Sequence, residues 1–312
     1  MLAKFLATLG RFATQLMAGT VFAALLVPDL AHVMKPLLGP SVWGLLFVAM
    51  VRLDWPGVVR HVRRFGLIAA ALVWMLVVCP VIVWGLTEMS GLSPGVAAAL
   101  VLMAASAPLM STPAVSIMIG LDGSLALVAM VGATFLAPLT VPIIALELLG
   151  LEIEIGVLGM MLKLIGMVGS AFVLALVFRR VAGLQQIQKW SNGLDGFVVI
   201  LMALFALAIM DGITAVLLAE PLKVLLIVVL SFVANGGLQI AGALVFRRTA
   251  KQERYTLGFV SGMRNMGLIL AVLPVGVDQD IVLYFAMAQF PIYILPALLK
   301  PLYRRLLAAR QE

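Results

Sequence analysis

Long apolar runs separated by short polar clusters follow one another along almost the whole chain. A helix needs ~20 apolar residues to cross the ~30 Å hydrocarbon layer of a membrane, and most of these runs reach about that length. The pattern therefore predicts an all-α polytopic membrane protein with no soluble domain. We expect ten transmembrane helices, near residues 12–30, 38–52, 66–87, 93–121, 123–147, 155–178, 195–218, 221–246, 255–275 and 281–301.

Composition favours the same fold class. Of the 312 residues, 64% are apolar and 11% are charged, whereas a soluble domain has roughly 45–50% and about 25%. The net charge of +7 does not indicate a nucleic-acid partner, because the basic residues lie in short clusters between apolar runs. We expect membrane lipid to surround the chain, and the sequence gives no oligomeric state.

The distribution of Lys and Arg predicts the orientation. With ten spans both termini share one side, and that side carries nearly all of the basic residues, while the opposite side carries only Lys35 and Lys223. Basic residues gather on the cytoplasmic side of membrane proteins. We therefore expect a multi-pass protein of a bacterial-type inner membrane with both termini in the cytoplasm.

The fourth predicted span, from Ser93 to Leu121, is too long for one helix. It would extend ~45 Å at 1.5 Å per residue, and it contains Pro108 and Pro113. Because proline removes a backbone donor and clashes with the preceding turn, we expect two half-helices, about 93–107 and 113–121, joined by an unwound segment.

The ninth predicted span has a matching interruption at Ser261–Gly267, and it ends at Pro274. Both breaks occupy the fourth place of five, which predicts two inverted five-helix repeats, residues 1–150 and 151–312. Paired broken helices in inverted repeats are the best sequence pointer to a transport site at the membrane midplane. The alternative is that the Gly and Pro residues are merely tolerated, as in many transmembrane helices.

Several short motifs resemble the bile acid:sodium symporter family over nearly the whole chain: Val27-Pro28-Asp29, Ser111-Thr112-Pro113 through Asp122-Gly123, Thr134 to Pro138, Asn235-Gly236 and Gly262-Met263-Arg264-Asn265. The resemblance implies a panel domain and a core domain, with the fourth and ninth helices unwound and crossing in the core. It also implies a secondary transporter that works by alternating access.

The chain departs from the family at the sodium sites. Where sodium-coupled relatives have a Glu and a Gln in the ninth-span break, this chain has Val260 and Arg264, and the Ser-Asn pair of the fourth-span break becomes Ala114 and Val115. The third-span Gln has no counterpart in the run from Met75 to Pro80. Of the sodium-site pattern three residues remain, namely Thr134, Met263 and Asn265.

Arg264 is the residue for which the sequence gives the strongest indication of a functional role. A cation near the bilayer centre costs ~2.5–3.5 kcal/mol on insertion scales, so it needs a partner or a wet cavity. It can replace the sodium ion or meet an anionic substrate. Alternatively it has a structural partner, either Asp211 or backbone carbonyls of the breaks. The other candidate substrate-binding residues are Asn265, Gly262, Ser111, Thr112 and Thr134.

Asp211 lies inside the seventh predicted span, nearer its outer end. Three interpretations stay open: it pairs with Arg264, it titrates during proton coupling, or it faces water.

The sequence therefore favours a sodium-independent secondary transporter of a small organic anion. A bile acid is disfavoured, because Pro291 and Ile292 stand where some relatives hold substrate with a polar pair. The alternatives are a sodium-coupled symporter with relocated ligands and a non-transporting sensor or channel on the same fold. We expect no enzyme, cofactor or metal, since catalytic motifs and clustered metal ligands are lacking.

Overall fold

The computed structural model describes residues 19–20, 23–24, 26–53, 65–149, 156–273 and 276–308. These residues form helices and no strand, apart from one isolated bridge between Pro108 and Arg264. The predicted all-α class is confirmed. The helices are α3 (Pro28–Met34), α4 (Leu38–Val51), α6 (Phe65–Val73), α7 (Cys79–Glu88), α8 (Pro94–Ala105), α9 (Thr112–Ile119), α10 (Gly123–Ile143), α11 (Gly156–Ala182), α12 (Leu184–Lys189), α13 (Ser191–Ile209), α14 (Ile213–Ala219), α15 (Pro221–Val245), α16 (Lys251–Gly262), α17 (Met266–Leu270), α18 (Gln279–Met287) and α19 (Gln289–Ala308).

Seven continuous helical segments among the described residues are long and apolar enough to cross a membrane. Each matches one predicted span, and together they indicate a multi-pass membrane protein. Short π-helical turns at Trp74–Val78 and Ile144–Leu148 lie within two of them. The seven segments are Pro28–Val51, Phe65–Glu88, Gly123–Leu148, Gly156–Ala182, Ser191–Ile209, Pro221–Val245 and Gln279–Ala308.

The three other predicted spans differ from these seven for separate reasons. Most of the first one, 12–30, lies outside the described residues, as does the predicted end of the ninth at Pro274. The fourth and ninth are interrupted, so that each consists of two helices shorter than a membrane span. The total of ten spans therefore stays a prediction.

The seventh span ends earlier than the predicted boundary of 218. Helix α13 stops at Ile209, and α14 begins at Ile213. Between them Gly212 has a φ of 78°, which is left-handed backbone that glycine adopts without a steric penalty and that commonly ends a helix. Asp211 thus lies in a turn between two helices and outside the continuous span.

The chain divides into two compact units, and each of them is discontinuous in sequence. Unit 1 consists of Met1–Leu53 and Lys163–Val224, and unit 2 consists of Asp54–Leu162 and Leu225–Glu312. Each unit takes one stretch from each predicted half of the chain. The predicted repeats, 1–150 and 151–312, therefore do not coincide with the compact units, and they stay a prediction about internal symmetry.

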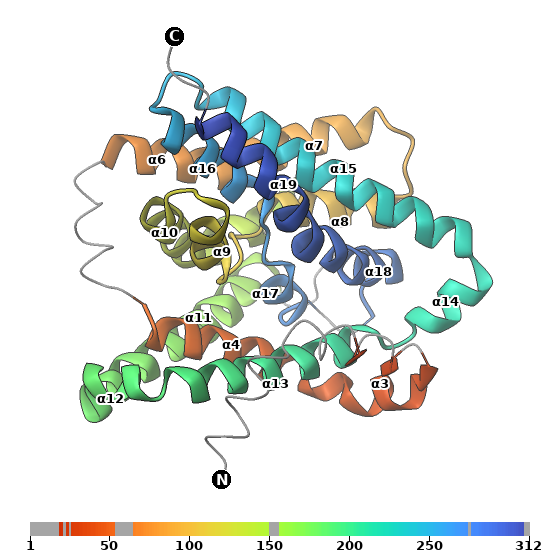
Figure 1. Ribbon diagram of the computed structural model, residues 1–312. Helices are drawn as coiled ribbons and strands as arrows, with labels where there is room; N and C mark the ends of the chain where they lie inside the picture. Colours follow the sequence, from red (N-terminus) through yellow and green to blue (C-terminus); the bar gives the residue numbers. More distant parts are fainter. Residues whose placement is uncertain are drawn as a thin grey trace. The chain divides into compact units, whose positions relative to one another are not determined.

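In unit 1, helices α4 and α13 run side by side (Figure 1). They approach closely because Gly44 has no side chain, and a Cβ there would lie 2.9 Å from Leu201. The C-terminal end of α4 is held by Arg179, whose Nη1 donates to the carbonyls of Val51 at 2.6 Å and Leu53 at 2.9 Å. An arginine side chain thus satisfies carbonyls that a helix end leaves without an intrahelical donor.

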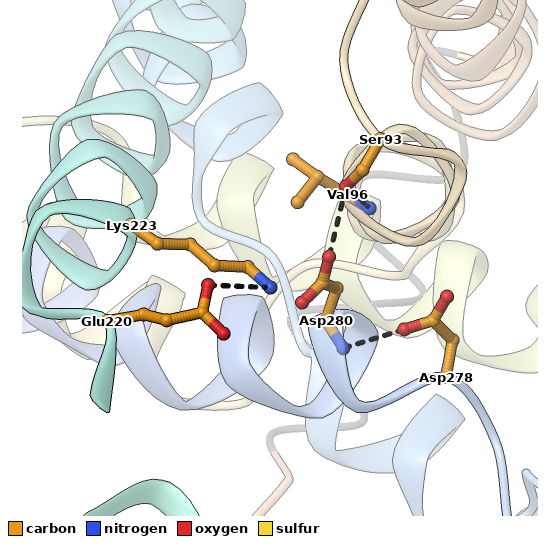
Figure 2. Close-up of polar contacts among 6 residues, drawn as sticks. All are labelled: Ser93, Val96, Glu220, Lys223, Asp278 and Asp280. Carbon is orange, nitrogen blue, oxygen red and sulfur yellow. Dashed lines mark hydrogen bonds and ion pairs between the residues drawn. The ribbon is translucent and has the colours of Figure 1, made fainter. Parts of the chain in front are cut away.

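In unit 2, helix α8 packs against α7 and α18 (Figure 1). The starts of α8 and α18 are joined, since the hydroxyl of Ser93 donates to Asp280 at 3.0 Å and the backbone N–H of Asp280 donates to Asp278 at 2.8 Å (Figure 2). Carboxylates at helix N-termini stabilise the helix through its dipole. This junction fixes one end of α8, and the other end leads into the first break.

Candidate functional site

The first break separates α8 from α9. Helix α8 ends at Ala105, and Ser106 has an extended backbone with a ψ of 151°. Pro108 follows two residues later, and the chain becomes helical again at Thr112. The position agrees with the effect of proline, which can neither donate to the preceding turn nor fit beside it.

The second break separates α16 from α17. Helix α16 ends at Gly262, and the chain is extended at Met263, with φ and ψ of −95° and 87°. Asn265 has nearly the same conformation, and α17 starts at Met266. Gly262 is required here by close packing, since a Cβ at this position would overlap the backbone carbonyl oxygen of Asn235 and the Cγ of Gln239.

The two breaks pair with each other through their backbones. The N–H of Leu109 donates to the carbonyl of Met263 at 2.9 Å, and the N–H of Asn265 donates to the carbonyl of Ala107 at 2.7 Å. These bonds form an antiparallel bridge centred on Pro108 and Arg264. Backbone that is not helical is tolerated at membrane depth only where it is buried in protein or lines a cavity, and here each break satisfies the other.

Arg264 lies at the centre of this crossing and is completely buried, with 0% of its surface exposed. Its Nε donates to the carbonyl of Ser261 at 2.6 Å. Its Nη1 donates to two further carbonyls, of Ser106 at 2.8 Å and of Met75 at 3.2 Å. The guanidinium therefore joins three separate segments of unit 2.

Two of these three acceptors lie at helix C-termini. Ser106 directly follows the last residue of α8, and Ser261 is in the last turn of α16. The final carbonyls of a helix have no intrahelical donors, and the helix dipole gives this end a partial negative charge. Arg264 thus occupies a place where the fold attracts a cation, and it is held by neutral carbonyls.

One end of the guanidinium remains open. The buried Nη2 of Arg264 makes no hydrogen bond in the part of the chain that the structure describes. The thiol of Cys79 also interacts with the guanidinium, both electrostatically and as a hydrogen-bonding side chain. A buried polar group without a partner costs free energy, so Nη2 is available to an acceptor such as a carboxylate oxygen or a water molecule.

The remaining predicted site residues are only partly brought together. Asn265 belongs to the crossing through its backbone, and Ser111 and Thr112 close the first break. Ser111 is exposed, whereas Thr112 is buried and its hydroxyl has no partner among the described residues. Thr134 is buried in α10, and its hydroxyl donates to the carbonyl of Met130 in its own helix at 2.8 Å.

Asp211 has its partners within unit 1. Its carboxylate lies 2.8 Å from the Nζ of Lys35 and 3.2 Å from the Nδ1 of His32. Partial burial opposes ionisation, but the hydrogen bonds and positive charges of Lys35 and His32 outweigh it and lower the pKa of Asp211. The cluster ties the C-terminal end of α3 to the turn between α13 and α14.

The sequence left two structural partners open for Arg264, namely Asp211 and backbone carbonyls of the breaks. The structure shows the second, through the carbonyls of Ser261 and Ser106. The third acceptor, the carbonyl of Met75, was missed, because every residue has a backbone carbonyl and the sequence does not distinguish this one.

Sequence reasoning also missed the hydrogen bond from Trp74 Nε1 to Ser261 Oγ at 2.9 Å, which fixes the last turn of α16. The part of α15 beside Gly262 could have been recognised from the sequence, because polar residues are spaced four apart in an otherwise apolar helix. They are Ser231, Asn235 and Gln239, and their side chains are buried.

No metal cluster is formed by the His, Cys, Asp and Glu residues in the described ranges. In comparisons with known proteins, no family model and no curated protein matches the chain. Its similarity to the bile acid:sodium symporter family therefore rests on the sequence motifs alone.

Proposed function

We propose that this protein is a secondary transporter that moves a small organic anion across the membrane by alternating access and without sodium. The observation that carries the proposal is the buried guanidinium of Arg264 at the crossing of two broken helices. Among the described residues it makes no hydrogen bond to a carboxylate, and its Nη2 has no hydrogen-bond partner. An anionic solute would supply the missing counter-charge.

The geometry limits how such a solute binds. Arginine usually grips a carboxylate with two parallel N–H donors from neighbouring nitrogens. Here Nε and Nη1 of Arg264 are already bonded to carbonyls, which leaves only Nη2. The solute therefore contacts the guanidinium end-on through one group, which suits a small carboxylate.

The same contacts argue for sodium independence. Sodium binds to hard oxygen ligands, and the carbonyls of Ser106 and Ser261 are already bonded to a cation that belongs to the chain. A second cation close to Arg264 would be repelled by its charge. A sodium-coupled symporter with relocated ligands is the alternative, and it needs an oxygen-lined site elsewhere.

The division of the chain supports an alternating-access mechanism. Both breaks, with all the contacts of Arg264, lie within unit 2, and unit 1 is a separate compact body. This is the arrangement expected of a core domain and a panel domain. We place the protein in a bacterial-type inner membrane with ten spans, cytoplasmic termini and two inverted repeats, as the basic residues and the paired breaks suggest.

Uptake of labelled small carboxylates into proteoliposomes tests the proposal directly. We expect uptake in sodium, potassium or choline buffer at similar rates, and a loss of at least about a hundredfold in Arg264→Gln, since the variant lacks the charge that meets the anion. Arg179→Gln is the matched control and should retain uptake. Uptake that disappears without sodium and returns with it would support the sodium-coupled alternative.

A counterflow measurement separates a transporter from a sensor or channel. Unlabelled anion inside the vesicles should accelerate entry of the labelled anion, because a carrier returns faster when it is loaded. No acceleration would favour a channel.

A further inference from the structure

Helix α15 carries a line of buried polar side chains that the proposed site does not use. Ser231, Asn235 and Gln239 are spaced four residues apart, and their exposed fractions are 0%, 1% and 3%. Residues four apart lie on one face of a helix, and α15 is long and apolar enough to cross a membrane. Polar side chains in such a helix are costly and usually functional.

Most of the hydrogen-bonding groups along this line are satisfied. The hydroxyl of Ser231 donates to Val228 O at 2.7 Å, and Asn235 Nδ2 donates to Ser231 O at 2.8 Å. The Oε1 of Gln239 accepts from the hydroxyl of Tyr303 at 3.0 Å. The amide ends that remain have no partner in the described ranges: one acceptor, Asn235 Oδ1, and one donor, Gln239 Nε2.

The two residues that carry these amides lie beside the second break. A Cβ at Gly262 would overlap the backbone carbonyl oxygen of Asn235 and would lie 2.5 Å from Gln239 Cγ. Arg264 follows two residues later, and two residues span at most ~7 Å of chain. The second break therefore brings the backbone of Arg264 close to the α15 residues that carry the two amides.

We propose that Asn235 and Gln239 form a second subsite, which binds a hydroxyl group of the transported anion. A hydroxyl is one donor and one acceptor on a single atom, so it can donate to Asn235 Oδ1 and accept from Gln239 Nε2. With the anionic group at Arg264, the substrate class becomes small hydroxy-carboxylates. This inference rests on the proposed function and narrows it.

Binding of a matched pair of acids, butyrate and 3-hydroxybutyrate, to the purified full-length protein tests the subsite. Two additional hydrogen bonds should give the hydroxylated acid about tenfold tighter binding in the wild type, since each contributes roughly 0.7 kcal/mol. In Gln239→Met one of the two bonds remains, so this preference should fall to about threefold, while the affinity for butyrate stays unchanged. Gln289→Met is the matched control, because the Gln289 amide donates within its own helix, to Phe285 O, and it should keep the tenfold ratio.

A second variant protects the test against misfolding. Asn235→Leu removes the Oδ1 acceptor and leaves Gln239 with its hydrogen bond from Tyr303, so it too should lower the preference. If the wild type binds both acids equally, the two amides hold only an internal water and the inference is overturned. If neither acid, nor any other carboxylate, binds or is transported, it is the proposed function that fails.

Discussion

Two arginines of this protein perform the same local task in very different surroundings. Arg179 in unit 1 and Arg264 in unit 2 both donate to backbone carbonyls at helix C-termini. Arg179 is half-buried, whereas Arg264 is completely buried at a crossing of broken helices. A half-buried arginine can therefore donate to helix-terminal carbonyls as well as a buried one, and this task alone does not explain why Arg264 is buried. What sets Arg264 apart is its burial in a membrane protein and its unused Nη2.

The largest expected effect is on stability: removing the guanidinium of Arg264 should lower the free energy of unfolding more than removing that of Arg179. Arg264→Met removes the donor from two helix-terminal carbonyls in the buried interior, those of Ser106 and Ser261, and a buried acceptor without a donor costs about 1–3 kcal/mol. We expect a loss of about 3 kcal/mol in the free energy of unfolding, against about 1 kcal/mol for Arg179→Met, measured by denaturant unfolding in detergent. Equal losses in the two variants would show that the two arginines have the same structural role.

The next effect concerns the close approach that places Arg264. Gly262→Ala introduces a Cβ that overlaps Asn235 and Gln239, and overpacking of this kind costs about 2 kcal/mol. Gly236→Ala, in α15, is the control, because a Cβ there meets nothing within 4 Å. Thermal unfolding should separate the two variants clearly. A harmless Gly262→Ala would contradict the tight contact between α15 and the second break.

A smaller effect on stability is expected when either of two tryptophan-to-serine hydrogen bonds is removed, one of them buried and the other exposed. Trp74 donates to Ser261 in the interior of unit 2 at 2.9 Å, and Trp43 donates to Ser170 at 3.0 Å in an exposed part of unit 1. Trp74→Phe should destabilise the protein by about 1 kcal/mol, and Trp43→Phe by about 0.5 kcal/mol or less, because only the buried ring of Trp74 leaves a cavity when it is replaced by a smaller one. Guanidinium or urea titrations of both variants measure the difference.

The smallest effect is the pH dependence of the Asp211 cluster. Its pKa is lowered from 3.8 in the folded protein, so the ionised carboxylate adds stability above pH 3.8 that disappears as the pH falls through the folded pKa. The group is partly exposed, and the contribution is about 0.5 kcal/mol. The melting temperature of the wild type should approach that of Asp211→Asn below pH 3.8. A constant difference between the two proteins at every pH would exclude this linkage.

Much of the framework could be predicted from the sequence, because the relevant signals are local. Pro108 and Pro113 interrupt the fourth span where the structure ends α8 and begins α9. The polar run around Arg264 locates the second break. The boundary at Gly212 was missed, since a single glycine inside an apolar run looks the same in the sequence whether it continues a helix or ends it.

The partners of Asp211 and the contact of Arg264 with Met75 could not be predicted. Arg264 meets Met75, 189 positions away, and Asp211 meets His32, 179 positions away. Such pairings depend on how whole helices pack. The spacing of four between Asn235 and Gln239 is visible in the sequence and would have predicted two polar side chains on one face of a helix. In the sequence analysis Asn235 appears only as part of the family resemblance.

The bonds of Arg264 to the fold have an energetic consequence for any anion that it carries. A sodium ion can dissociate at the far side of the membrane, but a side chain returns with the protein at the end of each cycle. The net charge that crosses is then that of the solute alone. A membrane potential of 100 mV changes the free energy by ~2.3 kcal/mol per elementary charge, which is about a fiftyfold concentration ratio at equilibrium. With the cell interior negative, a monovalent anion would leave the cell spontaneously, and its accumulation would need another source of energy.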